Sequence, residues 1–199
     1  MISVASASSL LVQPAPPATA FVAGTDQEVS GLVVLRVAEV CEFQEKLLRT
    51  IARCADPKQK DAVDQFGLPY CGGESYQIAP SQILFGTGVM LRNSNLDGNL
   101  KLMIREEVPR AQRQAAVQDA VAIMNTFNRL ANTAAEYQAF EPGDLVLFAD
   151  IYQDAREQLA KFFDYLPVKS KDRFYNYAQS VRKYEEKISK DDGIERMKL

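Results

Sequence analysis

Two short motifs contain residue types that bind nucleotides or metal ions in other proteins. Gly86-Thr87-Gly88, within "LFGTGVML", has the small residues of a phosphate-binding loop. It lacks the preceding strand pattern, and no third Gly or Gly-Lys-Ser/Thr end follows it. Close packing of helices at small residues therefore explains this motif better than nucleotide binding does.

The segment "NSNLDGNLKLMI" partly matches a calcium-binding loop. Asn93, Asn95, Asp97 and Gly98 stand at positions 1, 3, 5 and 6 of that template. Position 12, which requires a bidentate Glu, is Ile104. Because one carboxylate supplies too little charge for useful affinity, the segment predicts a turn at Asp97-Gly98 and no metal site.

The rest of the composition argues against catalysis. The chain has no His, which excludes Ser-His and Cys-His mechanisms and His-ligated metals. The carboxylate pairs Glu106/Glu107 and Asp191/Asp192 lie in polar sequence and are expected to be solvated. We expect no catalytic residue, no metal and no cofactor, so an enzyme or a nucleotide-dependent switch is the least favoured hypothesis.

The three cysteines allow at most one internal disulfide. Cys41 and Cys54 fall on one predicted helix, about 20 Å apart along its axis, which is too far to bridge. Cys54 and Cys71, across a loop rich in Gly and Pro, form the feasible pair. Three buried thiols are the alternative.

Charge is distributed unevenly along the chain. Residues 1–167 carry 14 basic and 20 acidic residues, whereas residues 168–199 carry nine basic and six acidic residues. The overall net charge of -3 disfavours a nucleic-acid partner. An acidic body with a basic tail is typical of a protein that docks on a larger complex.

The first 29 residues differ in composition from the rest. They are rich in Ser, Ala, Pro and Val, and they contain no acid before Asp26 and no Lys or Arg. Such a segment cannot build a core, so it is expected to be flexible. The small residues Ala18 and Ala20 flank Thr19 in a pattern that suits a signal-type peptidase, which favours a targeting role over a plain disordered arm.

Apolar periodicity predicts helices over 30–55, 81–107, 110–138, 143–165 and 170–190, the second interrupted near "NSNLDGN". Residues 56–80, with several Gly and Pro, predict a long loop. The apolar faces are expected to consist of Val33, Val37, Val40, Leu47, Leu48 and Ile51; of Val117, Ala120, Val121, Met124, Phe127, Leu130, Ala131, Ala134 and Tyr137; and of Leu145, Phe148, Tyr152, Ala155, Leu159, Phe162 and Leu166.

This order of elements predicts an all-α fold. Residues 30–167 are expected to form an up-down four-helix bundle, preceded by the flexible segment 1–29. Residues 168–199 add a basic, aromatic C-terminal helix that Pro167 separates from the bundle. No apolar run reaches the length of about 18–20 residues that spans a bilayer, so the protein is expected to be soluble or peripheral to a membrane.

The C-terminal helix is the predicted docking element. Its apolar and aromatic face would pack on a neighbouring protein, while its basic side chains would steer toward an acidic surface. A chain ending at Pro167 should then fold but bind poorly. The predicted partner-binding residues are Lys169, Lys171, Arg173, Phe174, Tyr177, Val181, Arg182, Lys183, Tyr184 and Ile188.

The last predicted bundle helix contains Tyr152-Gln153-Asp154-Ala155, followed by Leu159, Phe162, Phe163 and a closing Leu166-Pro167. This pattern matches the last bundle helix of the PsbQ-like extrinsic proteins of photosystem II, which residues 105–167 resemble. The opening helix "VLRVAEVCEFQEKLLRTIARC" is also similar. The three cysteines, the long loop and the extended C-terminus depart from the family pattern and suggest a divergent member, in a red-algal type of plastid.

The resemblance implies a function for the chain. It would be a non-catalytic subunit on the lumenal face of photosystem II, in contact with the core and other extrinsic subunits. There it would help retain the manganese-cluster environment, calcium and chloride of the oxygen-evolving complex without ligating them. The implied location is the thylakoid lumen of a plastid (the chloroplast in plants), peripheral to the membrane.

A second hypothesis keeps the helical fold and the docking tail but assigns a different location. The chain would then be a helical linker or scaffold protein of another photosynthetic or light-harvesting assembly. Exposure to the stroma would distinguish this hypothesis from the lumenal one.

Overall fold

The structure is a computed structural model that describes residues 24–55 and 78–191, with side chains described up to residue 186. All regular elements in these ranges are helical. They are α1 (Asp26–Ala55), α2 (Pro80–Ser94), α3 (Leu96–Glu106), the 3-10 turn η1 (Arg110–Gln112), α4 (Arg113–Ala135), α5 (Pro142–Phe163) and α6 (Val168–Asp191). The predicted all-α class is therefore confirmed for the described chain.

Local sequence signals explain where the helices begin. At α1, the Thr25 backbone N–H donates to Glu28 Oε2 at 2.8 Å, and the Glu28 N–H donates to Thr25 Oγ1 at 3.3 Å, which is a capping box. Helices α2 and α5 begin with Pro80 and Pro142 at their first position. Pro suits this position because its fixed φ is helical and its missing N–H would have no helical partner.

Helices α2 and α3 are separated at a single residue. Asn95 has φ 43° and ψ 47°, a left-handed conformation that Asn tolerates better than most residues. The Asn99 side chain donates to the Ser94 carbonyl at 2.7 Å across the break. The predicted interruption is confirmed, but the turn lies at Asn95 and not at Asp97-Gly98, which belong to the first turn of α3.

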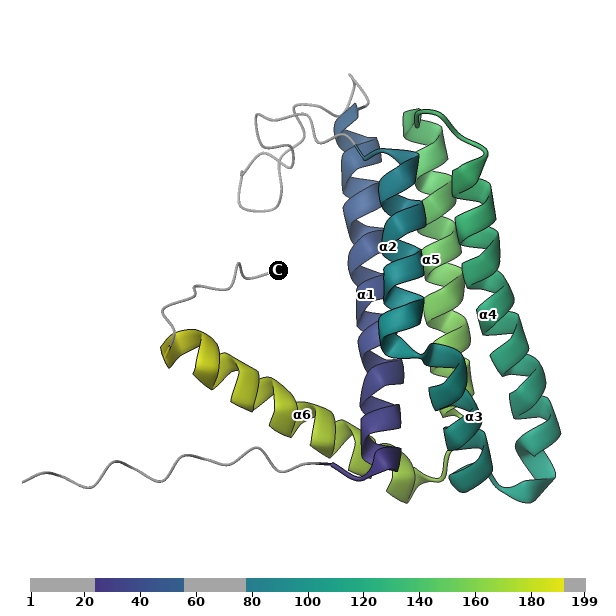
Figure 1. Cartoon of the computed structure of the whole chain (residues 1–199), viewed down its shortest axis with the longest axis vertical. Coiled ribbons are helices and arrows are strands. Elements are labelled where there is room, and N and C mark those ends of the chain that lie inside the picture. Colours follow the sequence, from purple (N-terminus) through teal and green to yellow (C-terminus); the bar gives the residue numbers. More distant parts are fainter. Residues whose placement is uncertain (1–23, 56–77, 192–199) are drawn as a thin grey trace, which may run out of the picture.

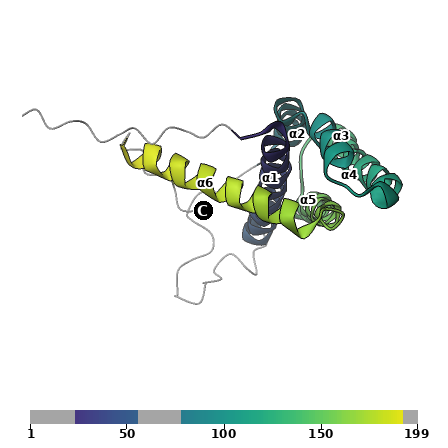
Figure 2. The ribbon, with the colours of Figure 1, turned by 90° about the horizontal axis from the view of Figure 1, so that it is seen from below.

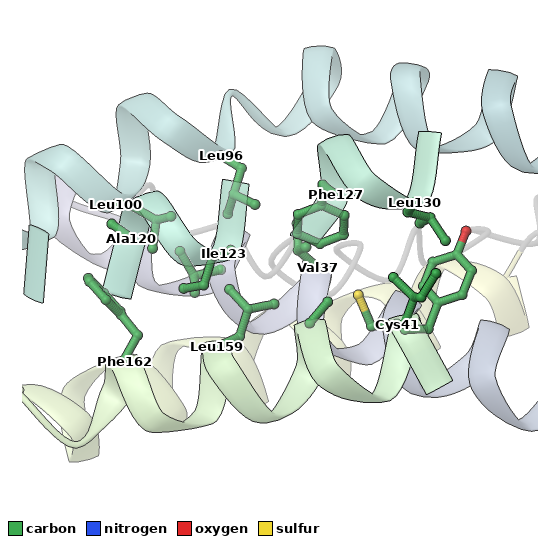
Figure 3. Close-up of a cluster of buried hydrophobic side chains, with 14 of the residues drawn as sticks. Val37, Cys41, Leu96, Leu100, Ala120, Ile123, Phe127, Leu130, Leu159 and Phe162 are labelled. Atoms are coloured by element: carbon green, nitrogen blue, oxygen red, sulfur yellow. The ribbon is translucent and has the colours of Figure 1, made fainter. Parts of the chain in front are cut away.

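Helices α1, α2, α4 and α5 lie side by side, with α3 continuing from the lower end of α2 (Figure 1). Helix α1 packs most extensively on α5 and also contacts α2, α3 and α6. The buried side chains between these helices include Val37, Phe127, Leu159 and Phe162 (Figure 3). The whole predicted apolar face of the 143–165 helix, from Leu145 to Leu166, is buried, as expected.

Part of the predicted apolar faces is wrong. Val117 and Val121 are 48% and 54% exposed, and Val40 is 40% exposed. The buried face of α4 keeps the predicted Ala120, Phe127, Leu130 and Ala134, but it includes Ala116 in place of Val117, one residue earlier and therefore about 100° around the helix. The small alanines allow neighbouring helices to approach, so the bulkier valines turn toward the outside.

Helix α6 leaves the other helices at a wide angle (Figure 1). Seen from below, it starts beside α5, crosses the end of α1 and continues beyond it (Figure 2). The Pro167 carbonyl accepts from the Ser170 and Lys171 backbone N–H groups, so Pro167 opens α6 shortly after α5 ends at Phe163. Helix α6 contacts α1 where the two cross, from Phe174 to Glu185.

Candidate docking surface

Phe174 anchors α6 to the rest of the chain. Its side chain is fully buried. It lies on Gly31 of α1, where an added Cβ would come within 2.5 Å of Phe174 Cγ. On its other side the Phe163 ring meets it edge-on, with ring centroids 6.4 Å apart. The predicted partner-binding residue Phe174 is thus part of the chain's own core, because a glycine in α1 leaves room for its ring.

Two further apolar residues of α6 continue this contact. Ala178 and Val181 are buried within the chain. The Gly24 backbone N–H donates to the Tyr177 hydroxyl at 3.2 Å. Tyr184 is half-buried, and the Ile188 side chain lies outside the described side chains. The predicted aromatic face therefore packs within the chain as far as Val181 rather than standing free.

Charged side chains of α6 also pair within the chain. Arg173 pairs with Glu107, whose second oxygen accepts from Ser170 Oγ at 2.7 Å. Lys171 pairs with Asp164 at 3.1 Å, and Arg182 pairs with Glu39. These three basic residues were predicted to steer toward a partner. The structure uses them to hold α6 in place, while Lys169 and Lys183 are exposed.

A second contact strengthens the crossing of α6 and α1. Arg36 donates to Glu185 at 2.8 Å and to Glu39 at 3.0 Å, so that Glu39 joins α1 to α6 through two arginines. The Arg36, Glu39 and Glu185 side chains are each about one third exposed, and Arg182 is half exposed. Sequence reasoning missed Arg36, Glu39 and Glu185, since nothing in the spacing along the chain places residues 36 and 185 together.

The divergence of α6 leaves a groove of ≈ 710 Å³ between α1, α5 and α6, which we call the α6 groove. Its apolar lining includes Leu35, Phe163 and Tyr175. Tyr175 is 49% exposed and lies with its ring centroid 6.2 Å from that of Phe163. Its charged lining includes Glu39, Glu42, Glu157, Asp164, Arg156, Lys161, Lys171 and Arg182. An apolar floor with a rim of both signs is the ordinary composition of a protein-binding surface.

The motifs considered for nucleotide binding and for acid–base catalysis lie within or beside helices. Gly86-Thr87-Gly88 lies inside α2, far from any helix start. Glu106 pairs with Arg105 at the surface, as expected, but Glu107 is only 11% exposed and was wrongly expected to be solvated. Within the described ranges, no three acidic or cysteine side chains gather closely enough to hold a metal ion.

The cysteines take two different states. Cys41 is a free, fully buried thiol, and burial raises its pKa to about 12. A thiol in this state is not a nucleophile at neutral pH. Cys54 is disulfide-bonded. Its predicted partner, Cys71, lies outside the described residues, as do segments 1–23 and 192–199 with the expectations placed on them.

None of the described helices combines the length and apolar character that a membrane crossing requires. Comparison of the chain with protein-family models, with curated proteins and with solved structures finds no match.

Proposed function

We propose that the chain is a non-catalytic, helical subunit that binds other proteins through the α6 groove. The observation that carries this proposal is the groove itself, in which half-exposed Tyr175 and other apolar residues lie among charged side chains of both signs. A protruding side chain or short helix of a partner would fill the floor, and the rim charges would set its orientation.

We further propose that the four side-by-side helices form an up-down four-helix bundle. In Figure 1, α1 and α4 run toward one end of the molecule, while α2–α3 and α5 run toward the other. This alternation supports the proposal, as does the unbroken buried face of α5. It is also the fold that the PsbQ-like resemblance of residues 105–167 implies.

On that resemblance, the proposed assembly is photosystem II. The chain would sit on the lumenal face, peripheral to the thylakoid membrane, in contact with the core and other extrinsic subunits. It would stabilise the oxygen-evolving complex by covering it and would limit the loss of calcium and chloride. Its own side chains would take no part in the chemistry.

The test is a graded salt wash of thylakoid membranes, with detection of the protein in the wash and measurement of oxygen evolution. Release at about 1 M salt, where charge attraction is screened within about 3 Å, together with lost oxygen evolution, would support the proposal. Release without loss of oxygen evolution, or recovery of the protein from the stroma, would instead support a linker role in another photosynthetic assembly.

A pair of exposed aromatic residues tests the groove itself. Tyr175→Ala removes the side chain above the groove floor, whereas Phe85→Ala removes a 70% exposed ring from α2 on another side of the molecule. Rebinding to washed membranes should weaken with Tyr175→Ala and stay unchanged with Phe85→Ala. Equal rebinding of both variants would exclude the groove as the docking surface.

A further inference from the structure

A second hollow lies between α1 and α2, against α5, and we call it the α1–α2 cavity. It has a volume of ≈ 310 Å³, which falls at the lower end of the range of small-molecule sites. Its walls include Leu47, Ile83 and Met90. All residues that line it are uncharged, in contrast to the α6 groove.

Two hydroxyl-bearing side chains line this apolar space. Thr87 is 1% exposed and Tyr152 is 4% exposed. Their hydroxyl oxygens are 3.5 Å apart, longer than the 2.5–3.0 Å of a normal O–H···O bond. Burial raises the pKa of Tyr152 to about 12, so its hydroxyl keeps its proton at neutral pH. Because the Thr87–Tyr152 hydrogen bond is long and weak, a hydroxyl of the pair can donate to a third group with little loss of hydrogen-bond energy.

Gly86 contributes no side chain to the wall of the cavity. It lines the cavity in the middle of α2, and a Cβ added there would meet no atom within 4 Å. A mid-helix Gly lowers helix stability by about 1 kcal/mol relative to Ala, and no close packing requires it here. Gly86 is exposed at the edge of the cavity, and the space beside it is open to a larger side chain.

We propose that the α1–α2 cavity binds a neutral, largely apolar small molecule that carries one carbonyl oxygen, such as a cyclic ketone. The uncharged walls exclude ionic ligands, because a charge moved there from water would have no counter-charge. The buried hydroxyls favour an acceptor over a pure hydrocarbon. The inference does not depend on the proposed role of the α6 groove.

The test compares two probes that differ in the carbonyl alone, 1-tetralone and its hydrocarbon analogue tetralin. Each is titrated into the full chain carrying methyl-labelled methionine, and NMR follows the Met90 methyl signal. Met103 is fully buried and Met124 lies on α4, and neither lines the cavity, so both act as internal references. A saturable shift of Met90, larger than those of the two references, is expected with 1-tetralone.

Three variants complete the design. Gly86→Leu fills the open space and raises helix propensity, so it should fold and abolish binding of both probes. Gly88→Leu is the matched control, since Gly88 is equally free of neighbours but does not line the cavity. Tyr152→Phe should weaken 1-tetralone about threefold to tenfold, the loss expected for one hydrogen bond, and leave tetralin unchanged.

The affinities of the two probes for the unaltered chain and the variants decide the proposal. Weaker binding of tetralin than of 1-tetralone, with loss in Gly86→Leu and retention in Gly88→Leu, supports the proposal. Absence of a saturable Met90 shift, or equal binding by Gly86→Leu and the unaltered chain, overturns the site. Equal affinity for the two probes overturns the carbonyl-bearing class of ligand.

Discussion

Helix α1 has a hollow on each flank, and the two differ in charge. The α6 groove is lined by acidic and basic side chains from α1, α5 and α6, whereas the α1–α2 cavity has none. The groove is open beside a helix that protrudes from the others (Figure 2), and the cavity lies between helices that run together. One helix thus borders two surfaces with different recognition chemistry.

The difference follows from how each flank is held together. On the α6 flank, ion pairs and one aromatic anchor fix a protruding helix, so charges surround whatever space is left. On the α2 flank, apolar packing holds the helices together, and uncharged residues line the space that is left. Charge favours fast, salt-dependent association with a protein, whereas an uncharged cavity selects by shape and by single hydrogen bonds.

The largest predicted effect concerns the anchor of the α6 flank. Phe174→Ala should lower the free energy of unfolding or of α6 detachment by about 3–5 kcal/mol, because a fully buried ring is lost. Chemical denaturation measures the free energy of unfolding, and hydrogen exchange of the α6 amides measures the free energy of α6 detachment. Tyr175→Ala, which removes the exposed neighbouring ring, is the control and should change little. If the two variants behave alike, Phe174 does not hold α6.

The next effect tests how dry the interior beside the α1–α2 cavity is. The Cys41 pKa is raised from 9.0 to about 12, so the folded state holds this proton more tightly than the unfolded state does. Its contribution is complete below pH 9 and is lost as pH rises from 9 to 12. Three pKa units correspond to about 4 kcal/mol, an upper bound on the loss of unfolding free energy.

Denaturation of the unaltered chain and of Cys41→Ala between pH 7 and pH 12 measures that loss. The variant starts from a lower stability because it leaves a small cavity, so the comparison is between slopes and not between absolute values. The unaltered chain should lose stability more steeply above pH 9. Parallel curves would show that water reaches Cys41.

A smaller effect separates two adjacent carboxylates on the α6 flank. Glu107→Gln removes the charge that binds Arg173 and Ser170, and it should cost about 1.5–3 kcal/mol, the usual range for a hydrogen bond to a charged group. Glu106→Gln alters a surface pair and should stay within about 0.5 kcal/mol. Thermal or chemical denaturation decides; a larger loss in Glu106→Gln would reverse the assignment.

Sequence reasoning predicted some of this well, for a physical reason. Proline marks the beginnings of α2, α5 and α6, and its stereochemistry acts within a few residues. The buried face of α5 could be predicted because large apolar residues repeat there by three and four. On α4, alanines and valines compete for the same face, and periodicity alone does not show which of them a neighbouring helix approaches.

The α6 flank could not be predicted in this way. The site of Phe174 depends on Gly31, and the partner of Arg173 is Glu107, 66 residues away. Such contacts depend on how the helices cross, which local patterns do not contain. The α1–α2 cavity was not predicted for a related reason. Gly86 was considered only as part of a phosphate-binding motif, and the cavity that it lines forms only where α1 and α2 come together.

The smallest predicted effect closes the comparison between the flanks. Arg36→Gln removes the contacts to Glu39 and Glu185, which are about one third exposed, and it should lower the free energy of α6 detachment by about 0.2–1 kcal/mol in low salt. Near 1 M salt, where the Debye length is about 3 Å, the difference should vanish. Hydrogen exchange of α6 at both salt concentrations measures it, and affinity for 1-tetralone provides the contrast. That affinity should not fall with salt, because no charge lines the α1–α2 cavity. If salt weakened both equally, the two flanks would not differ in the way their side chains imply.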